Sequence, residues 1–125
     1  MSQKRRRICL VTYDLVGPIR NGGIGTATTA LAEALADDGQ DVTILYMGRS
    51  HAERVPVSEC AEQYAAKNIR LVPLPPGRKF NTHCWGVLQS YDAYQWLAEQ
   101  HFDIINFHEW RGPGFHCICA KQLGL

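Results

Sequence analysis

The sequence predicts a doubly wound α/β fold in which helices cover both faces of one parallel sheet. Short runs rich in Val, Ile and Leu alternate with helical segments, most of these runs are nearly continuous in apolar residues, and the first connecting segment has clear helical periodicity. Strands covered on both faces show such continuous runs, and parallel neighbours are joined by right-handed helical crossovers. We therefore expect a Rossmann-like sheet with the strand order 3-2-1-4.

Four strands and four helices follow from this alternation. The strands are expected at residues 7–13, 41–47, 68–74 and 102–108. The helices are expected from Gly25 or Thr26 to about Gly39, and at residues 58–67, 84–100 and 115–125. Prolines rule out regular structure in residues 73–83, which should form a surface loop near the strand ends.

The composition is typical of one globular domain without a membrane span. The chain has 125 residues, of which 46% are hydrophobic and 20% are charged, and its net charge is +1. No apolar run approaches the roughly 18 residues of a membrane helix, and the N-terminal run ICLV is too short for a signal peptide. We therefore expect a cytoplasmic protein with no general attraction to nucleic acid. The basic run at residues 4–7 is interpreted as a solvated lead-in, with phosphate contact as the alternative.

The cysteines and the end of the chain lead to two further expectations. Cys9 lies in an apolar run, and Cys117 and Cys119 lack zinc-knuckle spacing, so we expect reduced, mostly buried thiols and no metal site. The chain also ends where the fold would begin a fifth strand, which would leave the fourth strand with an unpaired edge. Residues 1–125 are therefore expected to be an incomplete domain, from a fragment or a truncated product.

A glycine-rich loop, RNGGIGT at residues 20–26, precedes the first predicted helix. Gly22 and Gly23 carry no Cβ atom, which permits positive φ angles and lets a ligand approach the main chain closely. The helix supplies free N–H groups and the positive end of its dipole, and Arg20 can add a full charge. Together these features suit a diphosphate.

Two alternatives to a diphosphate loop remain open. One is a plain glycine-bearing connection without a ligand. The other is an NADP-binding oxidoreductase, whose dinucleotide fingerprint fits poorly because Thr28 replaces the third glycine and the loop is too long for a tight turn. In that case Arg49 could accept the 2′-phosphate.

A second motif, NFHEW at residues 106–110, ends the fourth predicted strand. In the order 3-2-1-4 the first and fourth strands are neighbours at the point where the order reverses, so both motifs should face one crevice. There His108 could donate to a sugar hydroxyl or carbonyl, and Trp110 could pack the base of the turn. A satisfied structural histidine is the alternative interpretation of His108.

With these two motifs the chain resembles the N-terminal domain of a retaining glycosyltransferase of the GT-B fold, in the family 4, glycogen synthase-like group. The resemblance covers essentially the whole chain. Residues 20–23 fall on the Lys-x-Gly-Gly loop of glycogen synthases, and residues 108–110 fall on their His-Asp-Trp turn. This sequence has arginine at position 20, glutamate at 109, and Asn106 where the synthases usually have histidine. A general sugar transferase is therefore favoured over a polyglucan synthase.

The resemblance implies that Arg20 and the main chain of Gly22 and Gly23 bind the donor diphosphate, and that His108 is the catalytic residue beside the transferred sugar. It also implies a nucleotide-sugar donor, a sugar or glycan acceptor, and no metal or other cofactor. The 125 residues would form the acceptor-side domain, without the C-terminal domain that holds most of the nucleotide, so the chain alone should lack turnover. A catalytically silent fragment or binding module is the alternative.

Overall fold

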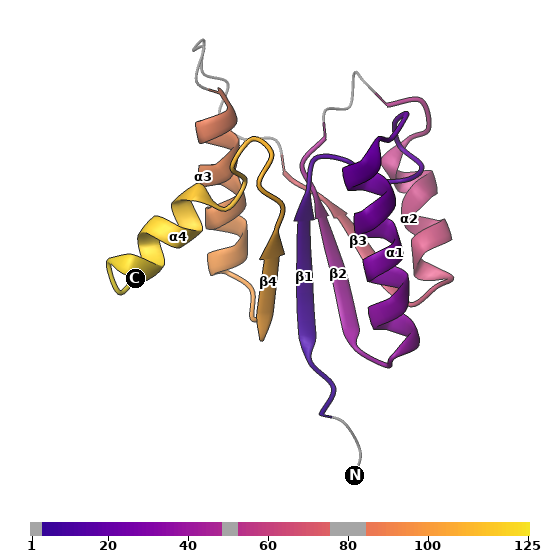
Figure 1. Ribbon diagram of the computed structural model, residues 1–125, viewed down its shortest axis with the longest axis horizontal. Helices are drawn as coiled ribbons and strands as arrows, with labels where there is room; N and C mark the ends of the chain where they lie inside the picture. Colours follow the sequence, from indigo (N-terminus) through magenta and orange to yellow (C-terminus); the bar gives the residue numbers. More distant parts are fainter. Residues whose placement is uncertain (1–3, 49–52, 76–84) are drawn as a thin grey trace.

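The computed structural model describes residues 4–48, 53–75 and 85–125, which form one parallel sheet with helices on both faces (Figure 1). The strands are β1 (Arg7–Thr12), β2 (Asp41–Tyr46), β3 (Ile69–Pro73) and β4 (Ile104–Phe107). The helices are α1 (Gly23–Asp37), α2 (Val57–Ala65), α3 (Trp85–Ala98) and α4 (Phe115–Gln122). The strand order is β3-β2-β1-β4, so the predicted fold class and strand order are confirmed.

Two apolar cores lie on opposite faces of the sheet. Because side chains alternate along a strand, Ile8 and Leu10 of β1 join the core beneath α1 and α2, whereas Cys9 and Val11 join the core beneath α3. β1 and β2 are buried along almost their whole length. The sheet thus holds the carboxyl ends of β1, β2 and β4 at one end of the molecule, opposite the N-terminal segment (Figure 1).

β4 departs from the predicted burial. Its Ile104 and Ile105, which point to opposite faces of the sheet, are 41% and 37% exposed. Among the described strands β4 pairs with β1 alone, and α4 packs on α3 while projecting away from the sheet (Figure 1). The expectation of a fourth strand covered on both faces is therefore wrong for the described residues. An apolar run shows what a strand can bury, but a neighbouring element has to cover it.

Two predicted boundaries differ for local reasons. The first helix begins at Gly23, ahead of the expected Gly25 or Thr26, because Gly22 already serves as its N-cap. Pro73 falls in both the expected strand 68–74 and the expected loop 73–83, and in the structure it ends β3 opposite Tyr46. Proline is tolerated there because β3 lies at the edge of the described sheet and Pro73 is its last residue. Most of the predicted 73–83 loop lies outside the described residues.

The cysteines and the basic run are placed as follows. The described cysteines are all reduced; Cys9 and Cys60 are buried, whereas Cys117 and Cys119 are half-buried. Burial raises the pKa of Cys9 to about 12. Residues 4–7 are exposed, as a solvated lead-in requires. No helix in the described part of the chain is both long and apolar enough to cross a membrane.

Candidate functional site

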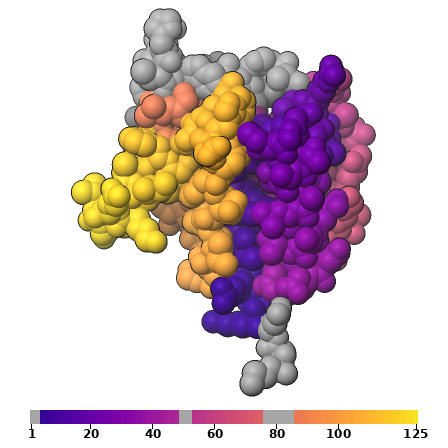
Figure 2. All heavy atoms as spheres, viewed as in Figure 1, coloured from indigo at the N-terminus to yellow at the C-terminus, as the bar shows by residue number. Residues whose placement is uncertain are grey.

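A cavity of about 530 Å³ lies at the carboxyl ends of β1 and β2. One wall is the segment between β1 and α1, together with the first turn of that helix; we call it the glycine wall. The other wall is the turn after β4, which contributes Trp110 and Arg111. Figure 2 shows these two parts of the surface side by side, although they are far apart in the sequence. The sheet therefore brings the two sequence motifs to one end of the molecule, as their places in the strand order predict.

Of the predicted site residues, Arg20, Gly22 and Gly23 line the cavity. His108 is close to it but is absent from the described lining. Its ring contacts Tyr13 and Trp110 edge-on or tilted, with centroid distances of 5.9 Å and 6.5 Å, and both of these residues do line the cavity. The structure thus places His108 behind the aromatic surface of the site.

The hydrogen bonds of His108 define its tautomer. Its Nε2 atom accepts a hydrogen bond from the backbone N–H of Tyr13, at 3.1 Å, so Nε2 carries no hydrogen. The neutral ring therefore carries its hydrogen on Nδ1, which is buried and has no hydrogen-bond partner among the described residues. Burial lowers the pKa of His108, and the carboxylates of Asp14 and Glu109 oppose this shift only in part. The burial of the ring and the hydrogen bond that Nε2 accepts therefore both favour a neutral imidazole.

Asp14 is a site residue that the sequence interpretation missed. It follows β1 and lines the cavity, and its Oδ2 atom accepts hydrogen bonds from the N–H groups of Gly22 and Gly25, each at 2.9 Å. The carboxylate thus caps the N-terminus of α1 from a distance, because the N-cap residue Gly22 has no side chain to do so. An acidic residue directly after the first strand was the available signal.

Gly25 is required by this carboxylate cap. A Cβ atom at position 25 would lie 2.7 Å from the Asp14 carboxyl group and 2.9 Å from Cβ of Asn21, closer than side chains tolerate. A Cβ atom at Gly23 would meet no protein atom within 4 Å. The two glycines therefore serve different purposes. Internal packing leaves no room for a side chain at Gly25, whereas Gly23 leaves open space that faces the cavity.

The expected positive φ angles are not used at the double glycine. Gly22 has a φ of −105°, and Gly23 begins an α-helix. The positive-φ glycine of the segment is Gly17, at φ 124°. The positive φ angles that Gly22 and Gly23 permit are therefore not adopted there, and what these glycines supply is space.

The N–H groups at the start of α1 fall into two sets, one that donates to Asp14 and one without a partner among the described residues. Gly22 and Gly25 donate to Asp14, whereas the N–H groups of Gly23 and Ile24 have no partner in the described part of the chain. Both of these residues line the cavity. Unpaired donors at the positive end of a helix dipole are suited to an anionic group.

Two arginines add positive charge to the same cavity. Arg20 lies exposed on the glycine wall, and Arg111 lies on the opposite wall. The Arg111 guanidinium sits over the ring of Trp110, 4.3 Å from its centroid, and 5.6 Å from the centroid of Tyr13. Arg49, on which the NADP alternative depends, lies outside the described residues. No group of three or more His, Cys, Asp or Glu side chains gathers as a metal site would require, as far as the structure describes the chain.

Comparison with known proteins assigns the family. The family model described as Glycosyltransferase Family 4 matches residues 21–125. Phosphatidyl-myo-inositol mannosyltransferase of Mycolicibacterium smegmatis is 26% identical over 114 residues, which cover 91% of this chain and 26% of that protein. The chain thus spans about a quarter of the length of this curated relative. No solved structure matches this chain. Since the family model covers most of the sequence, and both motifs lie at one cavity, the chain belongs to Glycosyltransferase Family 4.

Proposed function

We propose that this chain is the acceptor-side domain of a glycosyltransferase that moves a sugar from a nucleotide-sugar to an acceptor hydroxyl, with retention at the anomeric carbon. The observation that carries the proposal is the cavity, where the unpaired N–H groups of Gly23 and Ile24 lie on one wall with Arg20, and Arg111 lies on the other. Family membership and the mannosyltransferase relative support it. A C-terminal domain would hold most of the nucleotide, so the 125 residues alone would lack turnover.

In the proposed step, the acceptor oxygen bonds to the anomeric carbon while the bond from that carbon to the donor diphosphate breaks. The electron pair leaves with the diphosphate oxygen, and the acceptor proton passes to that oxygen on the same face of the sugar. The N–H groups of Gly23 and Ile24 and the charge of Arg20 would stabilise the negative charge that develops there. We therefore propose that transfer needs no metal ion or other cofactor. We also propose that it takes place in the cytoplasm.

His108 remains the proposed catalytic residue. Because the Tyr13 amide holds Nε2, Nδ1–H is the group left to donate to the transferred sugar. Since Nδ1 is buried behind Tyr13 and Trp110, this role requires those rings to move when the donor binds. His108→Ala should then lower the transfer rate more than it weakens nucleotide binding. Weakened binding at an unchanged rate would assign His108 a structural role.

Gly23→Val tests the proposal in the natural protein that carries this chain. A Cβ atom at position 23 meets no protein atom within 4 Å, so we expect valine to leave the fold intact and to fill the space in front of the donors. Release of nucleoside diphosphate from UDP-glucose, GDP-mannose and ADP-glucose, with sugar acceptors present, should fall by about a hundredfold or more for the accepted donor. Gly86→Val is the matched control, because Gly86 also lies in the first turn of a helix, has no protein atom within 4 Å of a built Cβ atom and is not among the residues that line the cavity.

Three outcomes would contradict the proposal. Unchanged release by Gly23→Val would remove the glycine wall from the mechanism. Tight NADPH binding without any response to UDP, GDP or ADP would favour the oxidoreductase alternative, and a protein that responds to none of these ligands would be the silent fragment.

A further inference from the structure

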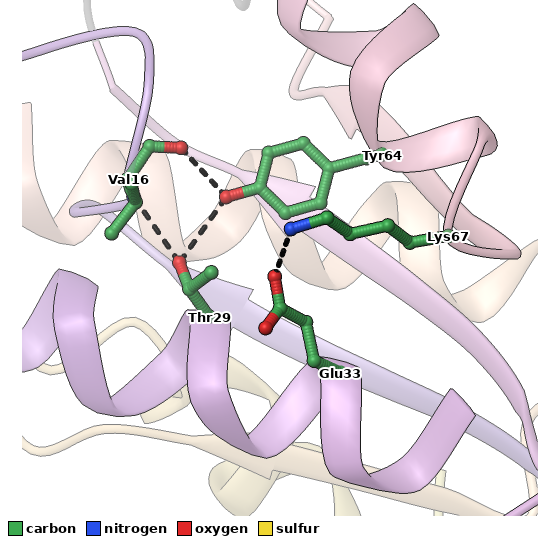
Figure 3. Close-up of polar contacts among 5 residues, drawn as sticks. All are labelled: Val16, Thr29, Glu33, Tyr64 and Lys67. Carbon is green, nitrogen blue, oxygen red and sulfur yellow. Dashed lines mark hydrogen bonds and ion pairs between the residues drawn. The ribbon is translucent and has the colours of Figure 1, made fainter. Parts of the chain in front are cut away.

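Three residues from separate parts of the chain form a closed set of hydrogen bonds beside the segment that lines the cavity (Figure 3). The Val16 N–H donates to Oγ1 of Thr29 at 3.2 Å, the Tyr64 hydroxyl donates to the Val16 carbonyl at 2.6 Å, and the two hydroxyl oxygens are 3.2 Å apart. Val16 belongs to the segment between β1 and α1, Thr29 to α1 and Tyr64 to α2. We call this arrangement the Val16 ring.

The direction of each hydrogen bond in the Val16 ring follows from counting hydrogens. The Val16 carbonyl can only accept, so the single hydroxyl hydrogen of Tyr64 points to it. The bond between the two hydroxyls must then use the hydrogen of Thr29, whose oxygen is left to accept from the Val16 N–H. Every donor in the ring has an acceptor, and the ring closes on both polar groups of one backbone residue.

The two hydroxyl groups of the Val16 ring belong to buried residues, although Val16 itself is 40% exposed. Thr29 is 8% exposed and Tyr64 is 5% exposed. Hydrogen bonds of this kind polarise one another in a low-dielectric setting, and the loss of one partner leaves the others unsatisfied. Burial raises the pKa of Tyr64, so its hydroxyl stays protonated and keeps donating at neutral pH.

The segment between β1 and α1 also forms hydrogen bonds on either side of Val16. The Asp14 carboxylate holds the N–H groups of Gly22 and Gly25, and the Pro18 carbonyl accepts hydrogen bonds from the N–H groups of residues 54 and 55. The Val16 ring lies between these attachments. It is the one of the three that connects the segment to both α1 and α2.

We propose that Thr29 and Tyr64 are positioning residues, which fix the segment from Tyr13 to Gly22 before any ligand arrives. Neither residue lines the cavity, so they act through Val16 on the wall that presents Gly23. The identity of the ligand rests on the proposed function, but the shape of the segment does not. A wall that is ordered in advance binds more tightly, because affinity falls with the fraction of molecules in the competent shape.

Amide hydrogen exchange in the 125-residue chain, without ligand, tests this proposal. Tyr64→Phe and Thr29→Val should each speed exchange at Val16, Gly22 and Gly25 by roughly tenfold relative to wild type, after correction for any change in global stability. Amides in the centres of β1 and β2 report that global change. Thr29→Ser keeps the hydroxyl and should restore slow exchange, which loss of packing alone would not predict.

Two control variants separate the Val16 ring from general contact between its helices. Glu33→Gln removes the ion pair with Lys67, which joins α1 to the turn that follows α2 (Figure 3). Tyr91→Phe removes a hydroxyl from an exposed tyrosine of α3. Neither should change exchange in the segment.

A coupled pair and a binding readout complete the test. The double variant Tyr64→Phe/Thr29→Val should exchange about as fast as either single variant, because each single substitution removes two of the three bonds and already opens the ring. Pyrophosphate should bind several-fold more weakly to the single variants, as followed by the tryptophan fluorescence of the chain, to which Trp110 of the cavity lining contributes. Exchange that rises no more in the segment than in the strands would overturn the positioning role. Failure of pyrophosphate binding in the wild type, with segment exchange responding as expected, would instead count against the proposed function.

Discussion

The two walls of the cavity are built in different ways. The glycine wall is tied by side-chain and backbone hydrogen bonds to α1, α2 and residues 54–55. The turn after β4 leaves Trp110 46% exposed and holds Arg111 at a φ of 64°. The described links from this turn to the glycine wall all reach Tyr13: the hydrogen bond with His108, the ring contacts of His108 and Trp110, and the guanidinium of Arg111.

This difference shows which wall supplies fixed geometry. The donors on the glycine wall are held in place without a ligand, as the binding of a developing charge requires. The opposite wall offers an aromatic surface and an arginine on a strand whose outer edge has no partner among the described strands. We therefore expect substitutions on the glycine wall to have larger effects than substitutions on the turn after β4.

The largest effect is expected from Gly25→Ala. The new methyl group would lie 2.7 Å from the Asp14 carboxyl group, so either the carboxylate cap or the start of α1 must shift. We expect a loss of about 2–3 kcal/mol in the free energy of unfolding, measured with urea. Gly23→Ala is the matched control, because its methyl group meets no protein atom within 4 Å. Equal stability of the two variants would show that Asp14 does not constrain the loop.

A smaller loss is expected from Asp14→Ala. It leaves the N–H groups of Gly22 and Gly25 without their acceptor and removes a negative charge from the start of α1. The expected loss in the free energy of unfolding is about 1–3 kcal/mol. Asp14→Asn keeps an oxygen that can accept these bonds and should lose less. If both variants lose the same amount, the charge matters and the hydrogen bonds do not.

The smallest effect concerns His108 and pH. Since its folded-state pKa is lowered, the unfolded chain binds more protons as the pH falls below the ordinary histidine value of about 6.5. The stability that neutral His108 provides is therefore present above that value and is lost as the pH falls through the folded-state pKa. His108→Gln should reduce the slope of unfolding free energy against pH between about 7 and 5. The reduction should be at most the slope that the uptake of one proton on unfolding produces. The same substitution at exposed His101 is the control, and an unchanged slope in His108→Gln would exclude this role.

The sequence predicted what depends on neighbouring residues. The continuous runs in β1 and β2 identified the central strands, and the alternation with helices gave the strand order. That order placed the double glycine and the turn containing Trp110 at one end of the sheet, where both line the cavity. Parallel topology leaves few other arrangements for such a pattern.

The sequence could not predict what depends on distant partners. Tyr64 reaches Val16 across 48 positions, and its partner there is a backbone carbonyl, which every residue has. Asp14 caps a helix that begins several residues later, so the usual signal of a polar residue at the N-cap is missing. The exposure of Ile104 and Ile105 depends on what lies beside β4, which their own side chains do not reveal.

The most direct test of the account is an amide chemical-shift titration of the 125-residue chain with pyrophosphate and with UDP. We predict the largest shifts at the N–H groups of Gly23 and Ile24, and smaller shifts at Gly22 and Gly25, whose N–H groups already donate to Asp14. Saturable shifts with this pattern would place the anionic group at the first turn of α1. Shifts that are largest elsewhere, or absent at Gly23 and Ile24, would contradict the proposed site.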